Sequence, residues 1–254
     1  MQIITLTSDL GSSDYYVAAL KGVLLNELSD ITLIDLNIHI KPFDLRQAAY
    51  QLSQAYRFFP EKTIHVVHIN PGFEKARVLI AQYANHTVVT FDNGLLSLLQ
   101  NGFSDKVFAL KPEWTDKSDL LLTKSVALAC AVASGKKSLD TFTEPFTEFR
   151  IKNLLKPTVR NNILKGSVVA IDTFGNAITD IHKDQFDAFV GGKPFKISIN
   201  QLAISEISLH YKSVSEGDLL ALFNSNGFLE IAINKGKAAT LLGIKVDNAV
   251  LITI

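Results

Sequence analysis

The first hundred residues alternate between short runs rich in β-branched residues and segments whose apolar positions recur every three or four residues. Residues 3–7 form the first such run, and the apolar positions between residues 16 and 24 follow the i, i+3, i+4, i+7 rule of an amphipathic helix. Further strands are predicted at 31–36, 63–70, 77–83 and 87–92, and further helices from about residue 44 and at 95–99. This repeated order predicts right-handed crossovers and a mostly parallel sheet with helices on both faces.

The pattern changes in the second half of the chain. Residues 142–162 form a polar, proline-containing stretch without clear periodicity, which we interpret as the connection between two domains. Short β-rich runs separated by Gly, Asn and Asp follow it, as is typical of a small antiparallel barrel or sandwich. The sequence therefore predicts an α/β protein with an N-terminal α/β domain (1–150) and a smaller C-terminal antiparallel β-barrel domain (151–254).

Charge and cysteine content narrow the range of partners. The 25 Lys and Arg residues balance 25 Asp and Glu residues, so no global positive field attracts nucleic acid or an anionic membrane. The sequence shows neither a signal-like start nor a run of about 18 apolar residues, which predicts a cytoplasmic protein without a membrane segment. The one cysteine, Cys130, lies in an Ala-rich stretch and is expected to pack in the core. These features favour a small-molecule partner.

Polar side chains follow several of the predicted strands. Asp9 and Asp14 come after the first strand, Asn70 and Arg77 after the third, and Asp92 after a later one. Ligands of open α/β sheets bind beyond the carboxyl ends of the strands, so these residues are the first candidates for a binding site. A carboxylate such as Asp9 can accept hydrogen bonds from two neighbouring hydroxyls of a ribose, but it can equally cap the next helix.

Two loops of the second domain carry similar groups. Asp172, Phe174 and Asn176 belong to the segment DTFGN, and Ser225 and Asn226 belong to NSNG. Both are ordinary turn sequences, yet Asn and Ser side chains can also read an adenine edge or a carboxylate. The residue pattern alone thus indicates a two-domain protein that binds a small molecule, without naming that molecule.

Metal and cofactor chemistry find little support in the sequence. His68 and Asn70 share one face of a strand because they lie two residues apart, but no carboxylate or further histidine stands at ligand spacing. The chain has no G-x-G-x-x-G, P-loop or G-x-S-x-G pattern. We therefore predict a site with neither a metal ion nor a bound cofactor.

Six segments, read in order, resemble the S-adenosylmethionine hydroxide adenosyltransferases, the hydrolase relatives of the fluorinases and chlorinases. They are TSDLGSSDYYVAALKG, DLNIHIKPFDLRQAAY, INPG with a following Arg, DNGLLSLL, AIDTFGNAITDI and NSNGFLEIAIN. The resemblance implies a homotrimer in which S-adenosylmethionine lies between one subunit's N-terminal domain and the next subunit's barrel. Water would attack C5′ of the ribose, and the products would be adenosine and methionine.

The resemblance also implies roles for residues of the N-terminal domain. Asp9 would hold the ribose hydroxyls, Asp14 would lie near the methionine part, and Phe43 would lie against the ligand. Asn70 stands where the hydrolases have an aspartate, and Arg77 matches their arginine. An amide cannot take a proton as a carboxylate can, and losing such general acid–base help typically costs ~10²–10⁴ in rate.

On the barrel side, the resemblance implies contacts from the two loops. Asp172 would meet the methionine amino group, Phe174 and Asn176 would contact adenine, and Ser225 with Asn226 would supply contacts at the rim. Together with the residues of the first domain, these five side chains would enclose the substrate.

One family feature is missing. The family's histidine follows a Thr-Phe pair ahead of a helix, and the corresponding stretch, LLLTKSVALACAVASG, contains no histidine. Thr123, Lys124 and Ser125 offer polar groups there, and His68 is a further candidate. Since a sulfonium leaves without protonation, hydrolysis remains the first hypothesis. The alternatives are a non-catalytic protein that binds S-adenosylmethionine or adenosine, and a halogenase, which is disfavoured because Asn70 replaces an aromatic residue.

Overall fold

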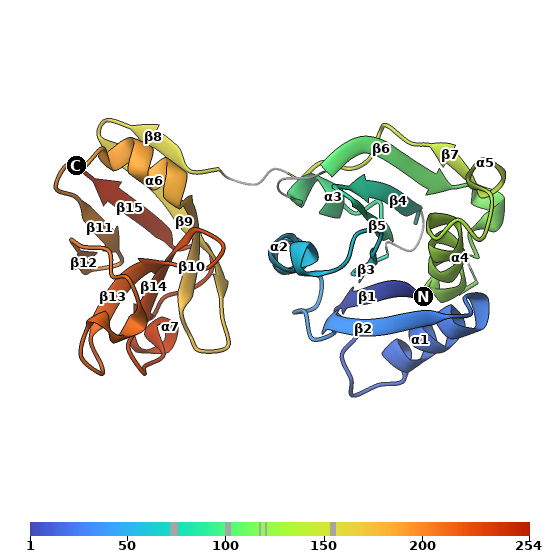
Figure 1. Ribbon diagram of the computed structural model, residues 1–254, viewed down its shortest axis with the longest axis horizontal. Helices are drawn as coiled ribbons and strands as arrows, with labels where there is room; N and C mark the ends of the chain where they lie inside the picture. Colours follow the sequence, from blue (N-terminus) through green and yellow to red (C-terminus); the bar gives the residue numbers. More distant parts are fainter. Residues whose placement is uncertain (72–75, 100–102, 117, 120, 153–155) are drawn as a thin grey trace. The chain divides into compact units, whose positions relative to one another are not determined.

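The computed structural model describes residues 1–71, 76–99, 103–116, 118–119, 121–152 and 156–254. The chain divides into two compact units, Met1–Asn153 (unit 1) and Leu154–Ile254 (unit 2), which are labelled by element in Figure 1. The sequence placed the domain boundary after residue 150.

Unit 1 is built on a mixed sheet. Its strands are β1 (Gln2–Ser8), β2 (Ile31–Asn37), β3 (Ile64–His68), β4 (Val78–Tyr83), β5 (His86–Phe91), β6 (Phe103–Leu110) and β7 (Thr143–Pro145). They lie in the order β2-β1-β3-β5-β4-β6-β7. The pairs among β2, β1, β3 and β5 are parallel, whereas β4, β6 and β7 pair antiparallel. The predicted α/β class is confirmed, with the parallel strands gathered in one half of the sheet.

Helices cover both faces of this sheet (Figure 1). The helical segments are α1 (Tyr16–Glu27), α2 (Leu45–Ala55), η1 (Tyr56–Phe58), α3 (Leu95–Leu98), η2 (Pro112–Trp114), α4 (Thr123–Ala133) and α5 (Leu139–Phe142). Apolar residues of α1 and α4 form one core with Ile4, Leu6 and other strand residues. On the opposite face, the Tyr83 hydroxyl of β4 donates to Ser53 of α2 at 3.4 Å. Strands buried on both faces explain the β-branched runs seen in the sequence.

Unit 2 is antiparallel throughout its described pairs. Its strands are β8 (Thr158–Arg160), β9 (Ile163–Ile171), β10 (Ala177–His182), β11 (Lys196–Ile199), β12 (Leu202–Ile204), β13 (Leu219–Phe223), β14 (Phe228–Ile233) and β15 (Ala249–Thr253), with helical segments α6 (Lys183–Val190), η3 (Tyr211–Ser213) and α7 (Ala238–Leu241). The order is β12-β11-β15-β9-β10-β14-β13, and β12 contacts β13. The sheet therefore curls into the predicted barrel-like form.

The stretch expected to connect the domains contributes to both sheets. Residues 143–145 form β7, which pairs with β6, and residues 158–160 form β8, which pairs with β9. The connection is therefore shorter than predicted. The sequence did not reveal these two strands because three residues are too few to show a period of two. Cys130 is fully buried as expected, and burial raises the pKa of its thiol. In the part of the chain that the structure describes, no helix is long and apolar enough to span a bilayer.

Candidate functional site at the carboxyl edge of unit 1 and the loops of unit 2

The parallel strands of unit 1 bring several candidate residues to one edge of the sheet. Asp9 follows β1, Asn70 comes two residues after β3, and Asp92 directly follows β5. β1 pairs with β3 and β3 with β5 in parallel, so their carboxyl ends share an edge. β4 runs antiparallel to β5, and it therefore begins at the same edge, directly after Arg77. The structure places these four residues where open α/β sheets bind ligands.

Asp9 and Phe43 are in direct contact at this edge. The backbone N–H of Phe43 donates to the Asp9 carboxylate (Oδ2) at 2.9 Å across 34 residues of sequence. Phe43 adopts a left-handed backbone conformation with φ of 66°, and its ring is 70% exposed. The loop that begins at Asp9 is also held by the Gly11 N–H, which donates to the carbonyl of Ile38 at 2.8 Å. The Asp9 carboxylate is thus fixed beside the backbone of Phe43, whose side chain is exposed, and the roles of both residues toward a ligand stay predictions.

Asp14 lies in the exposed loop between Asp9 and α1. Its place near the same edge follows from the chain, since only four residues separate it from Asp9. Nothing in the described contacts joins Asp14 to Asp9 or Asn70, so its role near the methionine part stays a prediction.

Asn70 lines a cavity of about 360 Å³ at the end of β3. Its backbone has a φ of 41°, a left-handed conformation that Asn adopts more readily than most residues. The other polar residues that line this cavity are Asp92, Asn93, Arg150 and Lys152. The Asp92 carboxylate accepts the backbone N–H of Arg150 at 2.7 Å, which attaches the end of unit 1 to this edge. Gly72, the last residue of the INPG motif, lies outside the described residues.

Asn93 builds one wall of this cavity. Its amide Nδ2 donates to the carbonyl of Ile69 at 2.7 Å, and its Oδ1 accepts the N–H of Leu95 at 3.0 Å. The side chain is 8% exposed, so both bonds are shielded from water. Asn93 thereby ties the end of β3 to the start of α3 and holds the backbone next to Asn70.

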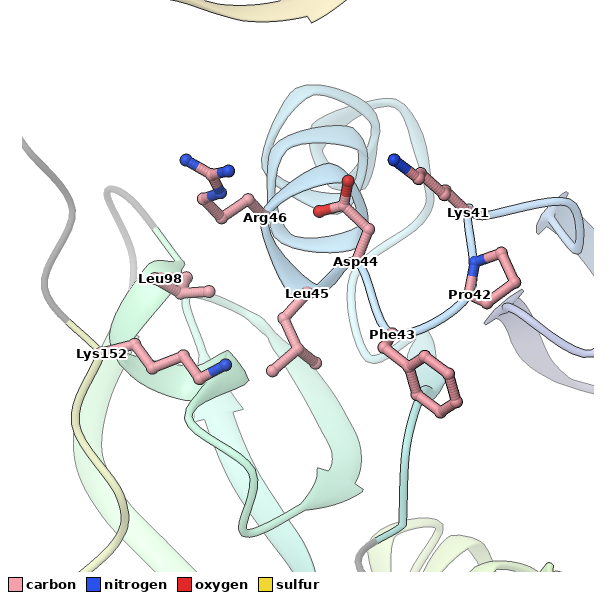
Figure 2. A pocket seen from close by; sticks show the side chains of 8 residues that line it. All are labelled: Lys41, Pro42, Phe43, Asp44, Leu45, Arg46, Leu98 and Lys152. Atoms are coloured by element: carbon pink, nitrogen blue, oxygen red, sulfur yellow. The ribbon is translucent and has the colours of Figure 1, made fainter. Parts of the chain in front are cut away.

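A second cavity of about 350 Å³ lies at the start of α2 and shares Lys152 with the first. Lys41, Asp44, Arg46 and Leu45 also line it, and Figure 2 shows the Lys152 ammonium directed from the α3 side toward Leu45. Asp44 caps α2, since its Oδ1 accepts the N–H of Gln47 at 3.0 Å. Because Phe43 also lines this second cavity, Lys152 and the expected ligand-contacting aromatic border one space.

Arg77 reaches the edge with its backbone but directs its side chain elsewhere. Its guanidinium pairs with Glu144 at 3.1 Å and lies 5.0 Å from the ring centroid of Phe146. Its carbonyl accepts the N–H of Asp92 at 3.0 Å. The expected catalytic arginine is therefore held by an ion pair and an aromatic ring, and no described contact joins it to Asn70.

His68 lies in the core behind the edge. It is 1% exposed, its Nε2 bonds to the carbonyl of Leu121 at 2.7 Å, and its ring meets Phe91 edge-on at 5.0 Å. A carbonyl only accepts, so Nε2 carries the proton, and Nδ1 has no partner among the described residues. Burial lowers the pKa of His68, while the carboxylates of Asp9 and Asp119 act in the opposite direction. A neutral imidazole thus joins β3 to the loop before α4.

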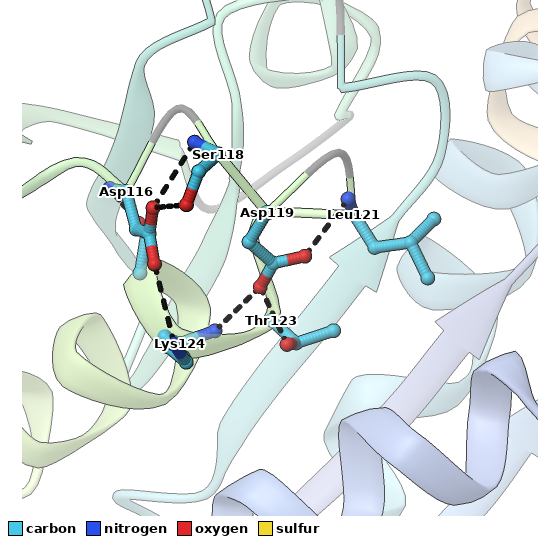
Figure 3. Close-up of polar contacts among 7 residues, drawn as sticks. Asp116, Ser118, Asp119, Leu121, Thr123 and Lys124 are labelled. Atoms are coloured by element: carbon cyan, nitrogen blue, oxygen red, sulfur yellow. Dashed lines mark hydrogen bonds and ion pairs between the residues drawn. The ribbon is translucent and has the colours of Figure 1, made fainter.

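That loop leads into residues 120–135, the stretch in which the family's histidine was expected, and two aspartates organise it (Figure 3). The Asp119 carboxylate accepts from the Thr123 hydroxyl at 2.7 Å and from the Lys124 N–H at 3.2 Å, which caps α4. Asp116 accepts from the N–H and hydroxyl of Ser118, and these bonds lower the pKa of Asp116.

The polar residues proposed to replace the histidine therefore already form hydrogen bonds or an ion pair within the protein. Thr123 bonds to Asp119, Lys124 pairs with Asp116 at 3.4 Å, and the Ser125 hydroxyl accepts the N–H of Asp116 at 2.9 Å. Thr123 and Ser125 are also buried. These contacts stabilise the loop and the start of α4.

In unit 2, the Asp172 to Asn176 loop closes on itself between β9 and β10. The Asp172 carboxylate accepts from the Asn176 N–H at 2.8 Å and from its amide Nδ2 at 3.0 Å. Gly175 has a φ of +84°, and a Cβ there would come within 2.8 Å of Lys237, so glycine is required. Asn176 is buried, whereas Phe174 is 76% exposed. The loop therefore presents one aromatic ring and one carboxylate on a rigid turn.

Glu230 connects this loop with the Asn224 to Gly227 turn that carries Ser225 and Asn226. Glu230 is 3% exposed and accepts the Tyr211 hydroxyl at 2.6 Å. Burial raises the pKa of Glu230, a hydrogen bond from Tyr211 opposes this, and the nearby Asp172 carboxylate raises it further. Asn224 holds the turn because its Oδ1 accepts the N–H of Asn226 at 3.1 Å. The two candidate loops of unit 2 therefore meet around one buried carboxyl.

Sequence reasoning missed three of these residues. Glu230 carried a signal, since it is the one charged residue in the apolar run FLEIAI. Arg150 and Lys152 carried none, because they lie in a stretch without periodicity. Its place at the edge depends on hydrogen bonds that their backbone N–H groups donate to Asp92 and Ser97.

Comparisons with known proteins point to one family along most of the chain. Residues 4–142 match the N-terminal domain, and residues 166–251 the C-terminal domain, of the SAM hydroxide adenosyltransferases. The (R)-S-adenosyl-L-methionine hydrolase of Methanocaldococcus jannaschii is 30% identical, over 96% of this chain and 93% of its own. A fluorinase of an Actinoplanes species is 25% identical, over 99% and 97% respectively. The crystal structure of an uncharacterized conserved protein from Thermotoga maritima is similar in fold, with a TM-score of 0.87 over the whole of both chains at 24% identity.

Proposed function

Because the chain belongs to the SAM hydroxide adenosyltransferase family, we propose that it hydrolyses (R)-S-adenosyl-L-methionine to adenosine and L-methionine. The observation that carries the proposal is the bond between Asp9 and the backbone of Phe43. This bond holds the Asp9 carboxylate, which we assign to the ribose diol, beside the backbone of Phe43, a residue with an exposed side chain. Asn70 follows a strand that ends at the same edge of the sheet. The relative from M. jannaschii, which is named for this activity, supports the same reaction.

The reaction is a displacement at the ribose C5′. A water oxygen forms a bond to C5′, the C5′–S bond breaks, and its electron pair stays on sulfur as methionine leaves. The Asp9 carboxylate accepts hydrogen bonds from the two ribose hydroxyls, and the Phe43 ring covers the ligand. The Asn70 amide oxygen accepts a hydrogen bond from the attacking water, which positions it without taking its proton. That proton passes to solvent.

Positioning is the main contribution of the protein in this mechanism. A fixed near-attack geometry contributes about 7–11 kcal/mol to rate in the most favourable intramolecular cases, and a sulfonium leaves without general acid help. Arg77 contributes by holding the start of β4 beside Asp92 through its backbone. In unit 2, we assign Asp172 to the methionine ammonium, Phe174 and Asn176 to adenine, and Ser225 and Asn226 to the rim.

Incubation of the purified protein with each sulfonium epimer tests the proposal. We expect adenosine and methionine to appear in equal amounts by chromatography, faster with the R epimer, and to depend on protein concentration. Binding by calorimetry without any turnover would contradict hydrolysis and support a protein that senses S-adenosylmethionine. Formation of a 5′-halogenated adenosine in the presence of halide would favour a halogenase.

We also propose that the protein works as a homotrimer, as the resemblance implies. Sedimentation equilibrium tests this separately from activity, with three chains expected per particle. A monomer at micromolar concentration that still produced adenosine would contradict the trimer without affecting the proposed reaction.

A further inference from the structure

The two cavities at the carboxyl edge of unit 1 are lined by cations. Lys41, Arg46 and Lys152 line the cavity at the start of α2, and Arg150 and Lys152 line the cavity beside Asn70. Two carboxylates also line them. Asp44 accepts the N–H of Gln47 and Asp92 accepts the N–H of Arg150. Four cations and two anions leave a net charge of +2 around spaces that share one lysine.

The position of Lys152 is set by the fold. Its backbone N–H donates to the Ser97 hydroxyl at 2.8 Å, and its carbonyl accepts from the same hydroxyl at 3.2 Å. Its side-chain stem lies over Gly94, where a Cβ would come within 2.7 Å of the Lys152 Cγ. Gly94 thus leaves the room that lets the lysine stem cross from one cavity to the other, and the ammonium is directed into the space shown in Figure 2.

We propose that Arg150 and Lys152 form a binding site for a small oxyanion, a carboxylate or a phosphate, beside Asn70. A guanidinium presents donors in a planar fork that matches two oxygens of an oxyanion, and an ammonium adds a point charge. The cavity beside Asn70, at about 360 Å³, is far larger than the ~30 Å³ share of one water, so it admits a polyatomic anion.

Two sources could supply this chemistry. One is the carboxylate of the methionine part of S-adenosylmethionine, and this source depends on the function proposed above. The other is a free oxyanion from solution. Both would make the same contacts with Arg150 and Lys152, and they differ only in whether the anion is attached to the substrate.

Inorganic phosphate, used as the probe on the intact protein, tests the site without any turnover. At constant ionic strength, replacing chloride by phosphate is expected to raise the Tm of the wild type because a ligand of the folded state stabilises it. Each of Arg150→Gln and Lys152→Gln should weaken phosphate binding about twofold to fivefold, the range for exposed charge pairs, and the double variant should lose the rise. Both residues make their bonds to Asp92 and Ser97 through the backbone, so folding should be retained.

Lys193→Gln is the matched control, since it removes one exposed lysine in the turn after α6 of unit 2. This variant should show the wild-type rise in Tm with phosphate. A wild type without a rise, or a double variant that rises as much as Lys193→Gln, would overturn the proposal. Neither result depends on whether the protein hydrolyses S-adenosylmethionine.

Decarboxylated S-adenosylmethionine separates the two sources. If the substrate carboxylate occupies the site, calorimetry should show tighter binding of S-adenosylmethionine than of the decarboxylated analogue in the wild type, and equal binding in the double variant. If a free oxyanion occupies it, the ratio of the two affinities should not change with the double variant, while the phosphate effect is still lost. Loss of phosphate binding supports the site in both cases, and an absence of adenosine would count only against the proposed reaction.

Discussion

The two units bury opposite kinds of titratable group. Unit 1 buries His65 and His86, which share a contact of 3.2 Å between Nε2 and Nδ1, while the cations at its edge stay exposed. Unit 2 buries Glu230 and partly buries Asp180. Burial lowers the pKa of His65 to about 3 and also lowers that of His86, and it raises the pKa of Glu230 and of Asp180. In both units, desolvation favours the neutral form of the buried group.

The two units should therefore respond to pH in opposite directions. A histidine whose folded pKa lies below its ordinary value of 6.5 contributes stability above that pH, and this stability is lost as the pH falls toward the folded pKa. A carboxyl whose folded pKa lies above its ordinary value of 4.5 contributes stability below that pH and loses it as the pH rises. Acid should thus weaken unit 1 while it favours the buried carboxyls of unit 2.

The largest expected effect comes from placing a base at the edge of unit 1. Asn70→Asp should raise the rate of adenosine formation about tenfold to a hundredfold. General base catalysis typically contributes a factor of ~10²–10⁴, and we expect less here because the nearby cations make the aspartate a weaker base. Single-turnover formation of adenosine measures the change. Asn70→Gln, which keeps the amide, is the control and should give no increase. An unchanged rate in Asn70→Asp would mean that removal of a proton from water does not limit the reaction.

The next effect concerns the affinity of unit 1 for S-adenosylmethionine. Asp9→Asn should weaken S-adenosylmethionine binding about tenfold or more, since each charge-assisted hydrogen bond contributes ~1.5–3 kcal/mol. The asparagine oxygen can still accept the Phe43 N–H, so the loop should keep its form. Calorimetry measures the affinity, and Asp35→Asn on β2, an exposed carboxylate paired with Lys21, is the control. Equal affinities in the two variants would contradict the assignment of Asp9 to the ribose.

The difference between the units also explains what the sequence could predict. The parallel strands and the residues at their ends followed from hydrophobic period and from the rule that ligands bind at carboxyl ends. Arg150 and Lys152 could not be placed, because their backbone N–H groups donate to Asp92 and Ser97, which are distant in sequence, and these bonds bring them to the edge. The ion pair between Arg77 and Glu144 could not be predicted from the sequence either, since the two residues lie 67 positions apart.

The contrast in pH response can be tested with a probe that belongs to unit 1 alone. The chain has one tryptophan, Trp114, so tryptophan fluorescence reports the unfolding of unit 1. Between pH 6.5 and 4.5, His65, whose pKa burial lowers to about 3, should make the free energy of unfolding of unit 1 fall by up to about 1.4 kcal/mol per pH unit. His65→Gln should reduce this slope, and His39→Gln, which changes an exposed histidine, should leave it unchanged. Parallel slopes in wild type and His65→Gln would contradict the buried-histidine account.

The smallest effect is expected in unit 2, where a hydrogen bond partly offsets the cost of burial. Glu230→Gln keeps an acceptor for the Tyr211 hydroxyl but removes the group whose ionisation burial disfavours. The stability of the variant relative to the wild type should therefore increase as the pH rises from 4 to 7, because the raised pKa of Glu230 makes the wild type lose stability over this range. Hydrogen exchange of the β14 amides measures this within unit 2, with Glu216→Gln, an exposed residue paired with Lys235, as the control. If the stability difference between Glu230→Gln and the wild type shrinks as the pH rises, the folded protein favours the ionised form of Glu230. Desolvation would then not control the ionisation of the buried carboxyl in unit 2.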